Sequence, residues 1–105
     1  MKVYVLNAPV ITDYGKYEFE PLSVEEAKEL LSGGFVSAVG HEATANALSE
    51  LLGIEIPVNR IQIKMKTGDM AVVFRVLTRL PEGKVLTRAE LEKIPWELGL
   101  LTKTG

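Results

Sequence analysis

The sequence has no cysteine and only one histidine, His41, among its 105 residues. Without cysteine the chain can form neither disulfide bonds nor thiolate metal sites, as is common for intracellular proteins. With a single histidine, a structural zinc site within one chain is not expected. The sequence also lacks a Walker loop and a metal-binding motif, so it gives little support to thiol chemistry or two-metal hydrolysis. We therefore expect no metal and no other cofactor.

Long hydrophobic runs are also missing. The first apolar run, residues 2–6, is too short for the core of a signal peptide. No other run approaches the roughly 20 residues that cross a membrane as a helix. Hydrophobic residues make up 47% of the sequence and charged residues 25%, which is typical of one globular domain. We expect residues 1–105 to form a single cytoplasmic domain with no membrane partner.

Positive charge is not in excess, because the formal net charge is −2. This balance argues against binding to long nucleic acid. The charges are unevenly distributed, however: residues 60–88 hold seven basic and two acidic side chains (+5), and the remainder holds five basic and twelve acidic (−7). A local basic surface on an acidic protein suits a small, highly charged anion. For any single one of these side chains, solvating a sheet face is the simpler explanation.

Apolar spacing and turn residues predict alternating strands and helices. Ser23 and Glu26 have the spacing of a capping box, which starts a helix that should end at Gly33 and Gly34. A second helix is expected over residues 42–52, with Gly53 as its stop signal. Strands are expected near residues 2–6, 17–21, 35–39, 59–66, 70–78 and 96–101, with a hairpin turn at 67–69 and a further helix at 87–94. This order favours an α/β fold with some parallel strand pairing.

The candidate site centres on residues 37–44, which read Ser-Ala-Val-Gly-His-Glu-Ala-Thr. An apolar strand turns at Gly40 and continues into the second helix, so His41 should lie at a helix N-terminus. Free backbone N–H groups and the positive end of the helix dipole make such a position a seat for an anion. A histidine there can give or take a proton near neutral pH. The simpler alternative is that His41 only caps the helix; Ser37 and Thr44 flank it without the spacing of a catalytic triad.

These residues fit metal-independent cleavage of RNA, in which the 2′-hydroxyl of the substrate is the nucleophile. The reaction needs an acid for the leaving 5′ oxygen, which contributes typically about 10²–10⁴-fold, and a cation for the pentacoordinate phosphate. His41 could supply the acid, and the loop at 79–84 holds an arginine and a glutamate. A helix N-terminus disfavours the imidazolium that an acid requires, whereas a nearby carboxylate favours it. We therefore expect Glu82 to approach His41.

Four motifs carry a resemblance to a known family. In chain order they are Leu6-Asn7-Ala8, the stretch 37–44, Asn59-Arg60-Ile61-Gln62-Ile63-Lys64, and Arg79-Leu80-Pro81-Glu82-Gly83-Lys84-Val85-Leu86. With these motifs the chain resembles the viral ring nucleases, a small anti-CRISPR family of archaeal viruses, bacteriophages and mobile elements. The resemblance extends over nearly the whole chain. It is weakest at residues 8–22 and assigns no role to Arg75.

The resemblance implies an α/β fold, a mixed β-sheet flanked by helices, assembled as a homodimer. Its implied substrate is cyclic tetra-adenylate, the second messenger of type III CRISPR defence, which the family cuts without metal into linear di-adenylates. The family uses an acid histidine, a transition-state arginine and a glutamate that supports the histidine. The site residues implied here are the catalytic His41, Arg79 and Glu82 and the substrate-binding Asn7, Gly40 and Arg60. Residues 77–93 would close over the ring as a lid, and a viral protein of this kind would act in the host cytoplasm.

Three alternatives stay open at the level of the sequence. A sequestering protein would bind the cyclic messenger without cutting it, and only turnover separates it from the enzyme. A small viral regulator, binding DNA or protein as a homodimer, is disfavoured in its DNA-binding form by the acidic net charge. A structural homodimer without a ligand is the default for a small domain, and a ligand-induced rise in melting temperature would exclude it.

Overall fold

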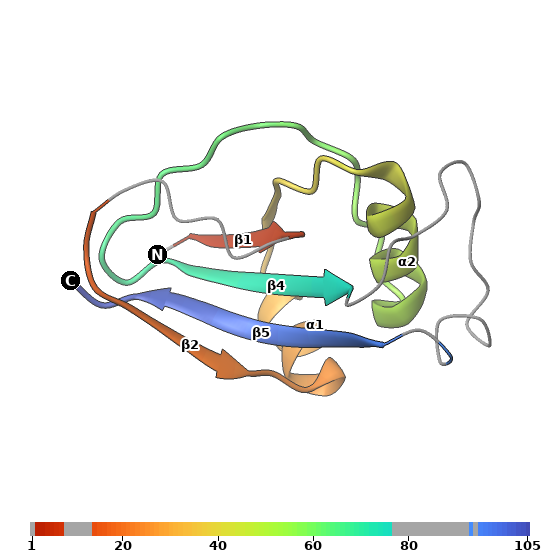
Figure 1. Ribbon diagram of the computed structural model, residues 1–105, viewed down its shortest axis with the longest axis horizontal. Coiled ribbons are helices and arrows are strands. Elements are labelled where there is room, and N and C mark those ends of the chain that lie inside the picture. The colour runs from red at the N-terminus through yellow and green to blue at the C-terminus, as the bar shows by residue number, and fades with distance from the viewer. Residues whose placement is uncertain (1, 8–13, 77–92, 94) are drawn as a thin grey trace.

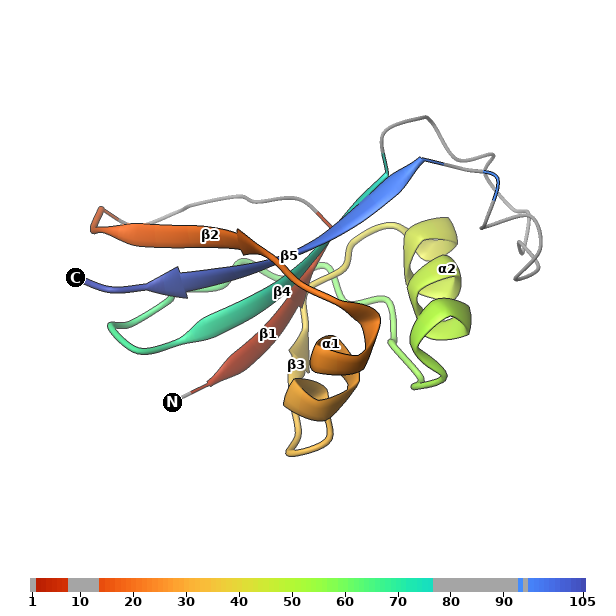
Figure 2. The same cartoon turned by 90° about the horizontal axis from the view of Figure 1, so that it is seen from below.

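The apolar strands assemble into one mixed five-stranded sheet, and both helices lie on the same side of it (Figures 1 and 2). The computed structural model describes residues 2–7, 14–76, 93 and 95–105. The elements are β1 (Val3–Leu6), β2 (Tyr17–Pro21), α1 (Val24–Leu31), β3 (Val36–Ser37), α2 (Glu42–Leu52), β4 (Met70–Val76) and β5 (Trp96–Lys103). They form a single α/β domain, as expected. The hairpin residues 77–78, the loop 79–84 and the helix expected at 87–94 lie wholly or mainly outside the described residues.

The two kinds of strand pairing meet at β4. The order of strands in the sheet is β2-β5-β4-β1-β3. β1 pairs in parallel with β3 on one side and with β4 on the other. β4 and β2 both pair with β5 in antiparallel fashion. The predicted parallel pairing is therefore confirmed, and the carboxyl ends of β1, β3 and β4 lie along one edge of the sheet.

Both helices begin where their N-cap residues predict, and α2 also ends at its predicted glycine, whereas α1 ends at Leu31, shortly before Gly33. Ser23 Oγ accepts the Glu26 N–H at 3.1 Å and the Glu26 carboxylate accepts the Ser23 N–H at 3.3 Å, which completes the capping box of α1. α2 starts after His41 and ends at Gly53, whose φ of 65° is the left-handed conformation that glycine adopts without strain. The expected helix at 42–52 is thus confirmed.

The sheet separates two apolar clusters. On the helix side, Val5, Val72, Phe74 and Leu98 pack against the buried face of α2 and against α1. On the other side, the sheet residues are Tyr4, Leu6, Ala71, Val73 and Leu101, and the side chains that pack on them include Ile63 and Met65. Because the side chains of a strand alternate between faces, each central strand contributes to both clusters. The sheet is thus covered on both sides.

The expected hairpin of residues 59–66 with β4 is wrong. Residues 55–66 form neither helix nor strand, and both sides of β4 are occupied by β1 and β5. The alternation of apolar and polar residues that suggested a strand here is seen in part: Ile63 and Met65 are buried and Gln62 and Lys64 are exposed, whereas Ile61, which was expected to share the face of Ile63 and Met65, is 45% exposed. The segment therefore covers the sheet with alternate side chains and takes no place in its ladder. The strand expected at 35–39 is also shorter, since only Val36 and Ser37 pair with β1.

A buried aspartate fastens the end of the sheet that holds the N-terminus of β4. Asp69 Oδ1 accepts the backbone N–H of Lys2 at 2.9 Å, and Oδ2 accepts that of Lys66 at 2.9 Å. The backbone oxygen of Asp69 accepts the Lys103 N–H at 3.1 Å. Burial alone would raise the pKa of Asp69, but the two N–H donors and the nearby positive charges outweigh it and lower the pKa below its usual value.

Candidate functional site

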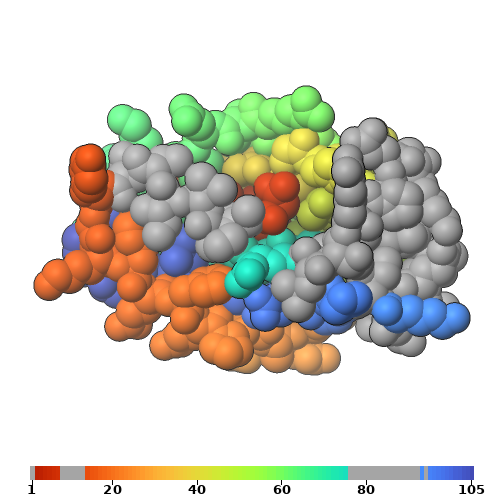
Figure 3. All heavy atoms as spheres, in the orientation of Figure 1, coloured from red at the N-terminus to blue at the C-terminus, as the bar shows by residue number. Residues whose placement is uncertain are grey.

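The carboxyl ends of the parallel strands bring the predicted site residues to one edge of the sheet. Asn7 follows β1, and Gly40 and His41 follow β3, while β4 reaches the same edge at Val76. In the space-filling view, atoms of β1 (red) lie beside those of residues near 40 (yellow), with atoms of β4 (cyan) below them (Figure 3). Ligands of open α/β sheets bind outside such carboxyl ends. We take this edge as the candidate site.

His41 is the N-cap residue of α2, as the sequence predicts. Its backbone is extended, with φ −125° and ψ 121°, and its ring nitrogen Nδ1 accepts the backbone N–H of Thr44 at 3.4 Å. The Thr44 hydroxyl lies 3.2 Å from the same nitrogen. Nδ1 can accept a hydrogen bond only in the neutral tautomer of histidine that carries its hydrogen on Nε2. The contact with Thr44 therefore leaves Nε2 as the ring atom available for proton transfer.

Four hydrogen bonds fix the backbone that precedes His41. They join residues 37–40 to residues 57–60: Ser37 Oγ donates to Pro57 O (2.6 Å), Asn59 Nδ2 donates to Ser37 O (2.8 Å), the Asn59 N–H donates to Val39 O (2.8 Å), and Arg60 Nε donates to Gly40 O (2.7 Å). Here Ser37 is buried and β3 is only two residues long. The short pairing of β3 with β1 ends at Ser37. Hydrogen bonds from the segment 57–60 therefore hold the turn that leads into His41.

Arg60 lies against Gly40 and keeps part of its guanidinium free. A Cβ added at Gly40 would lie 3.2 Å from Arg60 Cγ, so the absence of a side chain at Gly40 lets the arginine pass closely. Only Nε of Arg60 is used by the carbonyl of Gly40. The remaining guanidinium nitrogens make no hydrogen bond or ion pair with another described residue, and the side chain is exposed. A planar guanidinium held in this way suits a phosphate oxygen.

The other predicted site residues are placed only in part. Asn7 is exposed at the end of β1, on the same edge as His41. Arg79 and Glu82 lie outside the described residues, so the approach of Glu82 to His41 stays a prediction. Arg75, to which the sequence assigned no role, forms an ion pair with Glu97 at 2.8 Å, with side chains 42% and 48% exposed. The described part of the chain contains no group of three metal-ligating side chains.

Three residues of the site were missed as such by sequence reasoning. Ser37, Thr44 and Asn59 belong to motifs that carry the resemblance, but the sequence assigned none of them a role in the site. A hydroxyl three residues after an N-cap residue is a signal that could have identified Thr44, because that position faces the cap. The contacts of Ser37 and Asn59 span 20 and 22 residues of chain. No local pattern predicts them.

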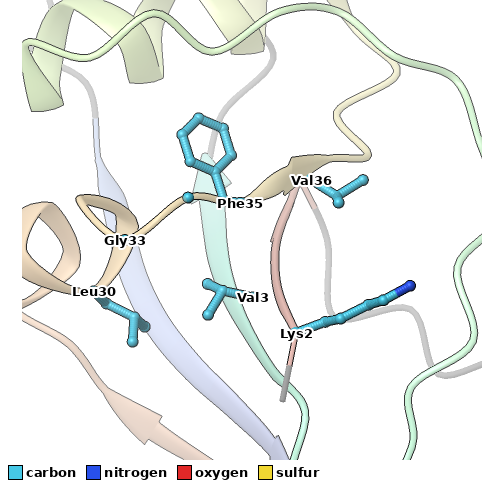
Figure 4. A pocket seen from close by; sticks show the side chains of 7 residues that line it. Lys2, Val3, Leu30, Gly33, Phe35 and Val36 are labelled. Carbon is cyan, nitrogen blue, oxygen red and sulfur yellow. The ribbon is translucent and has the colours of Figure 1, made fainter.

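A hollow lies at the opposite edge of the sheet. Its volume is about 400 Å³, and it is lined by Lys2, Val3, Leu30, Gly33, Gly34, Phe35 and Val36 (Figure 4). Lys2 is the one charged side chain among them, and none of these residues is suited to proton transfer near neutral pH. The carboxyl edge therefore remains the better candidate site.

Fold and site together define a small α/β protein with a mixed five-stranded sheet and a histidine-capped helix at the carboxyl edge of its parallel strands. Residues 3–98 match the family model described as STIV B116-like, and the chain belongs to this family. The solved structure of B116 from Sulfolobus turreted icosahedral virus superimposes with a TM-score of 0.84 at 27% identity, covering 97% of this chain and 99% of that one.

Relatives of similar length occur in viruses of archaea and in a bacterium. Protein ORF117 of Acidianus two-tailed virus is 43% identical over 103 residues, covering 91% of this chain and 88% of the relative. Protein 26 of a Sulfolobus islandicus filamentous virus is 44% identical over 104 residues, covering 93% and 88%. YddF of Bacillus subtilis is 36% identical over 106 residues, covering 98% of both chains. All three are named as uncharacterized proteins, so similarity to them does not identify a reaction.

Among the described residues, neither helix has the length and apolar character needed to cross a membrane.

Proposed function

We propose that the protein is a metal-independent ring nuclease that cleaves cyclic tetra-adenylate to linear di-adenylates and so suppresses type III CRISPR defence. The observation that carries the proposal is the hydrogen bonding of the His41 imidazole. Thr44 engages Nδ1, so Nε2 is the nitrogen left for proton transfer at the carboxyl edge of the sheet. Arg60 is tied to the residue before His41, and its other guanidinium nitrogens make no hydrogen bond within the described part of the chain, which supports Arg60 as a phosphate contact. The motif resemblance names the substrate.

In the proposed reaction the 2′-oxygen of one adenylate attacks its adjacent phosphorus, and the bond from phosphorus to the 5′ oxygen breaks. The 2′-hydroxyl proton leaves to solvent, and Nε2 of His41 gives a proton to the 5′ oxygen. The products are linear adenylates that end in a 2′,3′-cyclic phosphate. Arg79 would stabilise the charge of the pentacoordinate phosphate, and Glu82 would favour the imidazolium of His41. Asn7, Gly40 and Arg60 would hold the ring.

The proposal includes a homodimer. Cyclic tetra-adenylate has four equivalent phosphates and two-fold symmetry elements. Two copies of one domain placed around it would present two His41 residues to opposite phosphodiesters, which matches the commonest symmetry of protein dimers. The lid expected at 77–93 and action in the host cytoplasm belong to the same proposal.

A sequestering protein is the second candidate, and one observation favours it. His41 already has an ordinary structural task, because its side chain caps α2. A protein that only binds the messenger would show the same cap and the same free guanidinium at Arg60. Turnover alone separates the two functions.

The test is incubation of the purified protein with cyclic tetra-adenylate in EDTA, followed by chromatography of the products. His41→Asn is the sharpest variant, because asparagine is a good N-cap residue that preserves the helix but transfers no proton. His41→Ala removes both functions and serves as the comparison. We expect the wild type to form linear di-adenylates and His41→Asn to lose about 10²-fold or more in rate at an unchanged melting temperature.

Other outcomes would change the assignment. Tight binding of the ring without products would favour the sequestering protein. Equal cleavage by the wild type and His41→Asn would exclude His41 as the acid. Neither binding nor cleavage would leave the structural homodimer without a ligand as the better account.

A further inference from the structure

We infer that Thr44 is a positioning residue for His41, whose hydroxyl holds Nδ1 in both protonation states of the ring and so keeps Nε2 as the proton-transferring atom. The effect of Thr44 on catalysis rests on the proposed function, whereas the contact between the Thr44 hydroxyl and the His41 imidazole does not. Thr44 is the third residue of α2 and is buried, with 8% of its surface exposed. Its hydroxyl lies 3.2 Å from Nδ1, in a partly buried contact.

The two donors of Thr44 differ in what they can do when His41 changes protonation state. With neutral imidazole, both the backbone N–H at 3.4 Å and the hydroxyl at 3.2 Å can donate to Nδ1. In imidazolium, Nδ1 carries a hydrogen and can no longer accept. The backbone N–H then faces a second donor, and only the hydroxyl oxygen can reverse its role and accept. A hydroxyl is suited to this exchange because it is both donor and acceptor.

The groups around the ring leave this task to Thr44. Among the described residues, the side chain of His41 has no hydrogen-bond partner other than the amide and the hydroxyl of Thr44. Two charged residues are placed next to this turn in the described part of the chain: Glu42, which follows His41 and is exposed, and Arg60, which binds the carbonyl of Gly40. Without the hydroxyl, a charged ring would therefore lose its anchor and turn away from α2. Nδ1 and Nε2 would then no longer keep fixed positions relative to a bound phosphate.

Two substitutions separate the hydroxyl from the rest of the side chain. Thr44→Val replaces the hydroxyl with a methyl group of similar size and keeps the backbone N–H that caps the helix. Thr44→Ser removes only the methyl group and keeps the hydroxyl. If Thr44 merely fills space, valine should be the better replacement; if the hydroxyl positions His41, serine should be.

The first experiment needs no substrate and uses the fact that His41 is the only histidine. Ring nitrogen shifts and ring-to-residue-44 proton contacts are measured by NMR at pH 8 and pH 5 in the wild type and both variants. We expect the wild type and Thr44→Ser to keep one ring orientation at both pH values. We expect Thr44→Val to keep it at pH 8 and to populate several orientations at pH 5. A single, wild-type orientation of Thr44→Val at pH 5 would overturn the inference.

The second experiment measures cleavage of cyclic tetra-adenylate by the same three proteins, each checked for an unchanged melting temperature. Thr44→Val should lower kcat by about tenfold with little change in KM, because orientation of the acid acts on the reacting state and not on binding. Thr44→Ser should remain within about twofold of the wild type. Equal kcat values for wild type and Thr44→Val would refute the positioning role. If the wild type itself releases no product, the proposed function fails. The NMR comparison still shows whether the Thr44 hydroxyl holds the His41 imidazole in place.

Discussion

Replacing Asp69 with asparagine should destabilise the protein strongly without touching the candidate site. The carboxylate of Asp69 accepts two backbone N–H groups, those of Lys2 and Lys66, each at 2.9 Å. Asparagine has only one oxygen acceptor, so its NH₂ group would face one of these donors. A buried donor left without a partner costs about 1–3 kcal/mol, and the remaining bond loses its charge assistance. We expect a loss of about 2–3 kcal/mol in the free energy of unfolding at pH 7.

The sign of the pH dependence follows from the lowered pKa of Asp69. Burial raises this pKa, but the N–H groups of Lys66 and Lys2 and the nearby positive charges lower it further than burial raises it. A carboxyl with a lowered folded-state pKa stabilises the fold above its unfolded pKa of about 3.9. This stabilisation disappears as the pH falls through the folded value. The difference between wild type and Asp69→Asn should therefore be full above about pH 5 and should shrink in acid.

Urea unfolding at pH 7, 5 and 3 measures this, with the fluorescence of the single tryptophan, Trp96, as the probe. A loss of this size corresponds to a fall in Tm of about 10 °C for a domain of this length. Glu97→Gln is the matched control, because its ion pair with Arg75 is 42–48% exposed and should contribute less than about 1 kcal/mol. Equal stability of wild type and Asp69→Asn at pH 7, or a difference that grows in acid, would refute the reasoning.

Two further substitutions test close approaches to glycine. Gly40→Ala should leave Tm nearly unchanged but raise KM for cyclic tetra-adenylate several-fold, because the new Cβ would lie 3.2 Å from Arg60 Cγ and displace the guanidinium; an unchanged KM would contradict this. Gly99→Ala should lower Tm by a few degrees, because the ring of Phe19 occupies the place of the new methyl group. In a Phe19→Ala background the same change should cost nothing, as a double-mutant cycle of urea unfolding would show.

Local signals in the sequence predicted the elements whose hydrogen bonds are local. The helix expected at about 42–52 matches α2, because His41 caps its N-terminus and Gly53 caps its C-terminus. The capping box of Ser23 and Glu26 was predicted for the same reason. The predicted hairpin of residues 59–66 with β4 was wrong. An alternating pattern indicates which side chains are buried, but it does not indicate which strands form hydrogen bonds with each other. β1 and β5 take the two sides of β4 from distant parts of the chain.

The candidate site divides in the same way. The position of His41 at the start of α2 was predicted, since strand, glycine and helix follow one another directly. The contact of Arg60 with Gly40 crosses 20 residues of chain, and only the resemblance placed both residues in one site. The role of the Thr44 hydroxyl could not be predicted, because it depends on the rotamer of the histidine ring and on the burial of residue 44.

The position of β5 in the sheet has a consequence for the order in which the protein folds. Among the strands that the structure describes, β5 is the only neighbour of β2 and one of the two neighbours of β4, yet it comes last in the chain. The register pairs Tyr17 with Lys103 and Pro21 with Gly99, so β2 can pair only with a strand that lies about 80 residues further along the chain. During synthesis, β1, β3 and β4 can pair as they emerge, but both sides of the β5 position stay open until the chain is nearly finished. Such distant pairings slow folding, and an incomplete chain would present two unpaired strand edges to other molecules.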